Sequence, residues 1–111
     1  MSLRWEVVLS QQAERDFQRI LHWTGEQFAK AQVEIYRETL ISALVALEFG
    51  PGVWGARQRK DLGPGISLLS VARGGRKGRH FVVFRALNPG SLEVLRILHD
   101  SMDLPRHLPD L

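Results

Sequence analysis

The sequence contains no cysteine and only one tyrosine, Tyr36, among its 111 residues. Without cysteine the chain cannot form a disulfide scaffold, an iron–sulfur cluster or a zinc ribbon, and it cannot use a thiol as a nucleophile. Long apolar runs are also missing. The longest near-apolar stretch, residues 40–49, covers about half of a bilayer, and residues 1–6 have no apolar signal core. We therefore expect a cytoplasmic protein that does not contact a membrane.

Apolar residues make up 44% of the chain and charged residues 24%. A chain of this length buries about two-thirds of the surface that it exposes when unfolded, so it can hold a core without a metal or a disulfide. No internal repeat, low-complexity tract or linker divides the sequence. We predict a single domain over residues 1–111.

The net charge of +3 is unevenly distributed along the chain. Residues 1–49 carry five basic and seven acidic side chains, whereas residues 50–111 carry ten basic and five acidic ones. The basic residues are densest between Arg57 and Arg85, where eight of them accompany a single acid, Asp61. Most of the cations are arginine, which binds carboxylates and phosphates in a bidentate manner. This segment is either a docking surface for an anionic partner or a solvated basic loop.

The first half of the chain predicts a strand followed by two helices. Residues 4–9 are rich in β-formers, and Ser10 follows them as a helix N-cap. Apolar residues then recur every three or four positions over residues 11–28 and again over residues 33–47, and Gly50 ends the second helix. Because neither helix can bury its apolar face alone, the two should fold back as an αα-hairpin.

The second half predicts a loop and three strands. Residues 53–65 are rich in glycine and charge, and they precede β-rich stretches at residues 66–72, 79–87 and 91–98. Short turns join these stretches, so we predict a three-stranded antiparallel meander. Together with the N-terminal strand and the αα-hairpin, this gives an α+β fold in the order β-α-α-β-β-β.

The last two strands carry apolar residues on both faces, which is typical of central strands covered on both sides. The helices should cover one face and another layer the second. The tail after residue 98 should pack as irregular structure across an edge of the sheet. By strict alternation, Phe81 and Val83 face away from Val82 and Phe84, and Leu95 and Ile97 face away from Val94 and Leu98.

Three polar residues near the end of the chain, His99, Asp103 and His107, are spaced by four, as on a metal-binding helix face. Pro105 interrupts the helix that such a site needs, so we predict no metal site and expect no cofactor. His99 should instead cap the end of its strand through Asp103 or a backbone carbonyl.

Three further features each allow a structural and a functional interpretation. Arg96 interrupts an apolar strand face, with Glu93 on the opposite face; it either forms a salt bridge with a helix carboxylate or belongs to a partner-binding patch. The glycine-rich segment 74–78 is a charged hairpin turn, because it lacks the spacing of a phosphate loop. Trp54 lies beside the cations of residues 57–60 and could stack on nucleic acid, but the favoured interpretation is that it plugs the open end of the helical hairpin.

Four blocks of the sequence resemble ParE toxins. They are VVLSQQAERDF (7–17), LGPGI (62–66), RHFVVFR (79–85) and EVLRILHDSMDLPRH (93–107), in which an apolar strand ends in Arg-x-Leu-His and runs into an acidic and basic tail. The blocks occur in the family's order and span nearly the whole chain. The resemblance implies the RelE/ParE superfamily fold, a helical hairpin on a twisted antiparallel sheet.

The resemblance also implies the toxin of a type II toxin–antitoxin system. ParE-like toxins inhibit DNA gyrase, stabilise its cleaved-DNA complex and are silenced by a ParD-like antitoxin whose C-terminal segment wraps the toxin. Such an antitoxin would supply the layer on the second face of the sheet. The roles that follow are growth arrest and plasmid maintenance, and the implied partners are the antitoxin and gyrase, with direct nucleic-acid binding left open.

The RelE branch of the superfamily instead cleaves messenger RNA on the ribosome with sheet lysines and arginines and a tyrosine near the C-terminus. Here Tyr36 lies in a predicted helix, Met102 stands where an arginine would help, and residues 66–72 contain no lysine. We therefore expect a non-catalytic inhibitor with no catalytic residue. A RelE-type ribonuclease and a non-toxic relative that only binds its antitoxin are the alternatives.

Site residues follow from the resemblance and from the charge pattern. The antitoxin should place apolar side chains on the sheet and acidic ones near its arginines. The antitoxin-binding set is Arg73, Phe81, Val83, Arg85 and Arg96. The target-binding set is Arg57, Arg59, Lys60, His99, Asp103 and Arg106.

Overall fold

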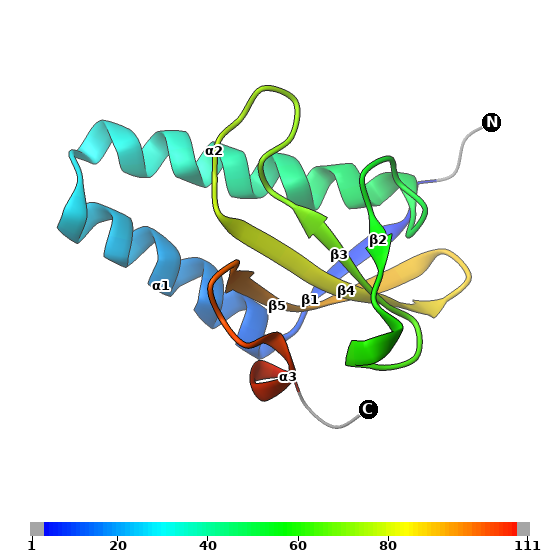
Figure 1. Cartoon of the computed structure of the whole chain (residues 1–111). Helices are drawn as coiled ribbons and strands as arrows, with labels where there is room; N and C mark the ends of the chain where they lie inside the picture. The colour runs from blue at the N-terminus through cyan, green and yellow to red at the C-terminus, as the bar shows by residue number, and fades with distance from the viewer. Residues whose placement is uncertain (1–3, 109–111) are drawn as a thin grey trace.

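In the computed structural model, which describes residues 4–108, a five-stranded sheet carries two long helices on one face (Figure 1). The strand order is β1-β5-β4-β3-β2, with β1 parallel to β5 and the other neighbours antiparallel. The strands are β1 (Glu6–Leu9), β2 (Arg57–Gln58), β3 (Ile66–Ser70), β4 (His80–Asn88) and β5 (Ser91–His99). The helices are α1 (Gln11–Gln27), α2 (Lys30–Ala46) and α3 (Leu104–His107), and single 3₁₀ turns lie at Leu47–Phe49 and Lys60–Leu62.

The predicted order of strand, helical hairpin and antiparallel meander is confirmed, with the exception of β2. This two-residue strand pairs with β3 inside the segment that we predicted as a loop. Its side chains are both exposed, so no apolar alternation marks it in the sequence. Among the described residues, no helix is long and apolar enough to cross a membrane.

Ser10 joins β1 to α1, as its predicted N-cap role requires. Its side-chain oxygen accepts a hydrogen bond from the backbone N–H of Ala13 at 3.0 Å. The same hydroxyl donates to the carbonyl oxygen of Leu95 at 2.8 Å, so the cap also fixes the start of α1 against β5. Gly50 follows α2 with φ of +100°, and a Cβ there would lie 2.8 Å from the indole nitrogen of Trp5. Glycine is therefore required where the hairpin returns to β1.

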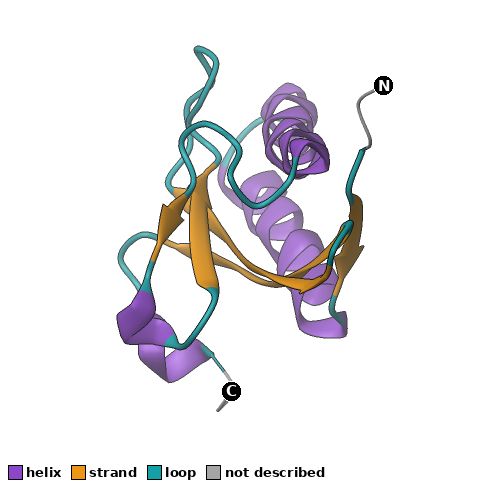
Figure 2. Ribbon diagram, turned by 90° about the vertical axis from the view of Figure 1, so that its right-hand side faces the viewer, coloured by secondary structure: helices purple, strands orange, loops and turns teal. Residues whose placement is uncertain are grey.

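Buried side chains form one cluster on each face of the sheet. The larger cluster lies beneath α1 and α2, and it includes Leu40, Val82 and Phe84 at 0% exposure. The second cluster contains Ile66, Val83, Leu95 and Leu98, among others. Figure 2 shows α1 and α2 on one side of the sheet and α3 on the other.

The second face is partly covered by the chain itself. Leu104 in α3 and Leu108 just after it pack on the second cluster, together with Leu62 from the other side. The prediction that the tail packs as irregular structure across an edge of the sheet is therefore wrong. The tail instead forms a short helix against this face. Pro105 is compatible with α3 since it occupies its first turn, where its missing N–H is not needed.

A β-bulge changes the facing of side chains in β5. Phe84 pairs with Val94 and Val83 pairs with Arg96, which leaves Leu95 as an extra residue. The prediction that Leu95 and Ile97 share a face is therefore wrong: Leu95 lies in the second cluster, whereas Ile97 lies in the cluster beneath the helices.

The bulge also brings Glu93 and Arg96 to the same groove, although strict alternation places them on opposite faces. The prediction for this pair is therefore wrong as well. The extra residue between them reverses the side of every position that follows it.

Candidate functional site

A groove of about 650 Å³ runs along the β2 edge of the sheet and is called the β2-edge groove here. Side chains from the loop before β2, from β2 and β3, and from β4 line it. They include Trp54, Arg57, Arg59, Leu68, Arg73 and Phe81. The groove thus brings together Arg57 and Arg59, expected to bind the target, with Arg73 and Phe81, expected to bind the antitoxin. Lys60 lies outside this lining, in the next turn.

The cations of this groove differ in how far their hydrogen-bonding capacity is used. Arg59 donates from Nε and Nη2 to the carboxylate of Asp61 at 2.9 and 2.7 Å. This contact raises the pKa of Arg59 and lowers that of Asp61. Arg57 is exposed, and within residues 4–108 it forms no ion pair. Arg73 has its Nη1 buried without a hydrogen-bond partner in the same part of the chain. Part of the hydrogen-bonding capacity of Arg73 is therefore unused among the described residues.

Trp54 stands at the mouth of the β2-edge groove with 88% of its surface exposed. The prediction that it plugs the open end of the helical hairpin is therefore wrong. Its neighbours Val53 and Ala56 pack against the helix-facing cluster instead and direct Trp54 outward. Its indole is therefore available for contacts outside the chain.

Two residues of the expected antitoxin-binding set are already engaged within the chain. Val83 is fully buried beneath the second cluster. Arg96 donates from Nε and Nη2 to the carboxylate of Asp16 in α1, at 2.7 and 2.9 Å, and this contact raises its pKa. The salt bridge with a helix carboxylate is confirmed. Arg85 is half-buried, lies 3.4 Å from Glu93, and has its Nε buried without a partner among the described residues.

The remaining target-binding residues do not converge. Arg106 contacts Asp103 at 3.3 Å in the first turn of α3, and Asp103 does not reach His99. His99 instead accepts at Nδ1 from the backbone N–H of Ser101 at 3.1 Å and lies 2.7 Å from its hydroxyl. His99 does lie at the end of β5, but the prediction that it acts through Asp103 or a backbone carbonyl is wrong, because its ring contacts Ser101. Within residues 4–108 no group of three His, Asp or Glu side chains is placed to hold a metal ion.

A second groove, of about 720 Å³, lies between the far ends of α1 and α2 and the loop that joins β3 to β4. We call it the Tyr36 groove. The Tyr36 hydroxyl lies 2.6 Å from Nδ1 of His80, and the His80 ring meets that of His99 edge to face with centroids 5.2 Å apart. Gly78 closes the loop against this cluster, because a Cβ there would lie 2.8 Å from the Tyr36 hydroxyl. The helical position of Tyr36 is confirmed, but sequence reasoning missed its contact with the sheet.

The Tyr36–His80 pair is uncharged at neutral pH. Burial, with the nearby His99, lowers the pKa of His80 from 6.5 to about 4, and burial raises the pKa of Tyr36. A general acid or base works best when its pKa is close to the working pH. Both groups have been moved away from that range, so the pair can form hydrogen bonds but is poorly suited to proton transfer.

One signal in the sequence does point to the histidine pair. The turn at Pro89 and Gly90 pairs Asn88 with Ser91, and the same register extended along the hairpin places His80 opposite His99. β4 and β5 each contain one register irregularity. The two shifts of register compensate each other, so His80 still pairs with His99. No such signal exists for Tyr36, which is 44 residues from His80 in the chain.

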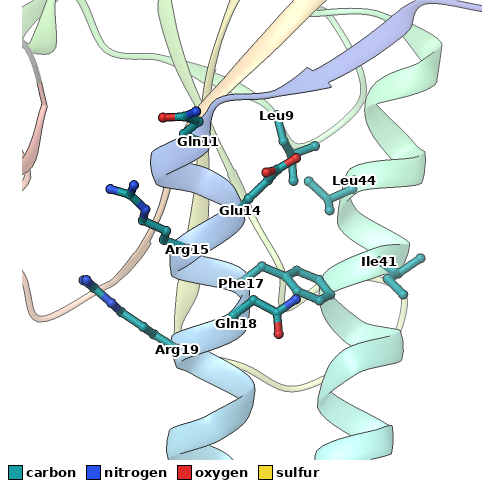
Figure 3. A pocket seen from close by; sticks show the side chains of 9 residues that line it. All are labelled: Leu9, Gln11, Glu14, Arg15, Phe17, Gln18, Arg19, Ile41 and Leu44. Atoms are coloured by element: carbon teal, nitrogen blue, oxygen red, sulfur yellow. The ribbon is translucent and has the colours of Figure 1, made fainter.

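A third groove, of about 770 Å³, lies between α1 and α2. Figure 3 shows Leu9, Phe17, Ile41 and Leu44 in the space between the helices, whereas Arg15 and Arg19 extend away from it. Glu14 and Gln18 also extend into this space, so the groove combines apolar and polar side chains.

Comparisons with known proteins match most of this chain. A family model described as the ParE toxin of the type II toxin–antitoxin system parDE matches residues 7–104. The chain is similar to Toxin ParE1 of Mycobacterium tuberculosis, with 29% identity over 108 residues that cover 97% of this chain and 100% of the relative.

Two solved structures have the same fold. A chain of the chromosomal ParDE system from P. aeruginosa superposes with a TM-score of 0.70 at 15% identity, covering 88% of this chain and 98% of that chain. A chain of the toxin–antitoxin complex RelBE2 from Mycobacterium tuberculosis gives a TM-score of 0.55 at 15% identity, covering 89% and 94%.

Proposed function

Because this chain belongs to the ParE toxin family of type II toxin–antitoxin systems, we propose that it inhibits DNA gyrase by binding and is neutralised by a ParD-like antitoxin. The observation that carries the proposal is the β2-edge groove, where residues expected for the target and residues expected for the antitoxin line one surface. An antitoxin in this groove would block the target by occupying the same side chains.

The chemistry of the groove defines what the antitoxin segment should present. Carboxylates would accept hydrogen bonds from the exposed guanidinium of Arg57 and would balance the positive charge of Arg73 beside it. An apolar or aromatic side chain would cover Trp54 and Phe81. Contacts with Val83 or Arg96 would require α3 to leave the sheet, so we centre the antitoxin-binding site on Arg73 and Phe81.

The proposed inhibition requires no chemistry of the toxin's own. The Tyr36–His80 pair is poorly suited to proton transfer, because the pKa of His80 is lowered to about 4 and burial raises that of Tyr36. Binding energy at a docking surface is then the means of action, as expected for an inhibitor that acts through protein contact.

A supercoiling and DNA-cleavage assay with purified gyrase tests the proposal. We expect the wild-type chain to inhibit supercoiling, and the Trp54→Ala/Arg57→Gln variant to lose both inhibition and antitoxin binding. The Phe49→Ala/Lys30→Gln variant, which removes an exposed ring and a cation elsewhere, should keep both. Unchanged supercoiling at saturating toxin would reject gyrase as the target.

Two further results would select the alternatives. Codon-positioned cleavage of messenger RNA on translating ribosomes would identify a RelE-type ribonuclease. Tight antitoxin binding combined with normal growth of cells that express the soluble chain would identify a non-toxic relative.

A further inference from the structure

The Tyr36 groove has the composition of a nucleic-acid site, and the function proposed above does not use it. We propose that it binds a single-stranded segment of nucleic acid, with bases stacked on Trp23 and Phe28 and phosphates held by Arg76 and Lys77. The inference concerns direct contact with a nucleotide chain and does not depend on which protein is the toxin's target.

The cationic side of the groove lies on the loop between β3 and β4. Arg76 and Lys77 are exposed, and within residues 4–108 neither forms an ion pair. Arg79 adds a third cation, although it shares its charge with Asp100 at 3.0 Å. No acidic residue is among the described side chains that line the groove. The site therefore presents unneutralised positive charge at one rim, which attracts phosphates.

The aromatic side of the groove lies at the far end of the helical hairpin. Trp23 and Phe28 are each more than half exposed, at 55% and 56%. Their rings meet edge to face with centroids 6.1 Å apart, so each retains an open face. Large exposed rings cost free energy in water unless a partner covers them. A nucleobase is such a partner, because it stacks on any aromatic face whatever its sequence.

The floor of the groove is polar but uncharged. The hydrogen bond between Tyr36 and His80 places a neutral pair between the aromatic and cationic sides. His99 accepts at Nδ1 from the backbone N–H of Ser101, and its ring packs edge to face on that of His80. An uncharged floor accommodates sugars and base edges, whereas an acidic peptide would leave the aromatic side without a matching partner. The arrangement of rings, neutral donors and cations thus favours a nucleotide chain over a carboxylate-rich one.

Fluorescence anisotropy with 5′-labelled dT12 and rU12 tests the inference on the purified chain without gyrase or ribosomes. The Arg76→Gln/Lys77→Gln variant should weaken binding at least tenfold and reduce the slope of log K against log salt by roughly 1.4, as expected for two lost phosphate contacts. The Arg15→Gln/Arg19→Gln variant makes the same charge change on the exposed side of α1, outside this groove, and it should alter binding less than twofold. Equal losses in the two variants would overturn the inference.

The stacking component has its own test. Trp23→Ala should weaken dT12 binding by about fivefold or more, and it should not alter binding of an abasic twelve-unit phosphodiester. Circular dichroism and thermal melting establish that each variant is folded. Binding of the abasic strand or of a twelve-residue polyglutamate as tightly as dT12 would overturn the inference. A preference between dT12 and rU12 identifies the source of the strand. A chain that inhibits gyrase but does not bind either oligonucleotide would reject this inference and leave the proposed function intact.

Discussion

Asp16 on α1 and Arg96 on β5, eighty residues apart in the chain, form a two-bonded ion pair in which Arg96 donates at 2.7 and 2.9 Å. The Asp16 carboxylate also accepts the backbone N–H of Ile97 at 2.9 Å. Nη1 of Arg96 donates to the carbonyl oxygen of His107 at 2.7 Å. One pair of side chains therefore connects α1, β5 and α3.

The first prediction concerns this pair. Asp16→Ala would leave the largely buried guanidinium of Arg96 without its carboxylate, and we expect a loss of about 3–5 kcal/mol in the free energy of unfolding. Urea denaturation followed by circular dichroism measures it. Asp16→Leu/Arg96→Met should cost much less because no unpaired charge remains. Glu14→Ala, on the exposed side of the same helix, should change stability by about 0.5 kcal/mol or less. A loss below about 1 kcal/mol for Asp16→Ala would contradict the role given to the pair.

The second prediction concerns pH. The pKa of His80 is about 4 in the folded chain and 6.5 when unperturbed. Between these values the unfolded chain binds the extra proton, so this residue makes stability fall as pH decreases from about 6.5 to about 4. The partly exposed ring limits the effect to roughly 1–2 kcal/mol. His80→Gln should remove this contribution to the difference in the free energy of unfolding between pH 7 and pH 4.5. His22 is exposed, so His22→Gln should leave that difference unchanged.

Nuclear magnetic resonance titration measures the pKa of His80 directly. The His80 ring should titrate near pH 4. A midpoint near 6.5 would mean that neither burial nor His99 acts on this residue as the geometry indicates.

The third prediction concerns Gly78. An alanine Cβ would lie 2.7 Å from Val71 and 2.8 Å from the Tyr36 hydroxyl, so either the loop or the Tyr36–His80 pair must move. We expect Gly78→Ala to cost about 1–3 kcal/mol in thermal or urea unfolding and to shift the His80 titration toward 6.5. Gly52 has no positive φ, and a Cβ there would have no neighbour within 4 Å. Gly52→Ala should therefore leave the free energy of unfolding nearly unchanged. Equal stabilities of the two variants would show that the loop does not rest on Tyr36.

The fourth prediction concerns the cover on the second face. Leu104→Ala should remove part of the layer above Val83 and Leu98 and lower stability by about 2 kcal/mol. Met102→Ala, at a more exposed site beside α3, should have little effect. If Leu104→Ala is equally mild, α3 does not protect this face in solution, and Val83 would become available to an antitoxin.

The sequence was most informative where one local feature determines the structure. Ser10 begins a helix because its hydroxyl has a donor three residues ahead, and that rule needs no knowledge of the remaining chain. The bulge at Leu95 was not predictable from alternation, because apolar residues at 94, 95, 97 and 98 suit either phase.

The candidate site was predicted in pieces rather than as a whole. Arg57, Arg59, Arg73 and Phe81 were expected in two separate sets, and the pairing of β2 with β3 and of β3 with β4 brings them to one groove. For Tyr36 the sequence predicts only a position in a helix. Its contact with His80 depends on how α2 lies on the sheet, which no local pattern encodes.

The parallel pairing of β1 with β5 determines when the protein can complete its fold during synthesis. Residues 6–9 have no strand partner until residues 91–99 have left the ribosome, and β4 lacks one of its neighbours until the same moment. A nascent chain holding only the helical hairpin has no sheet on which to bury it. We expect folding to be late and all-or-none, so that fragments released early are substrates for proteases rather than active toxins.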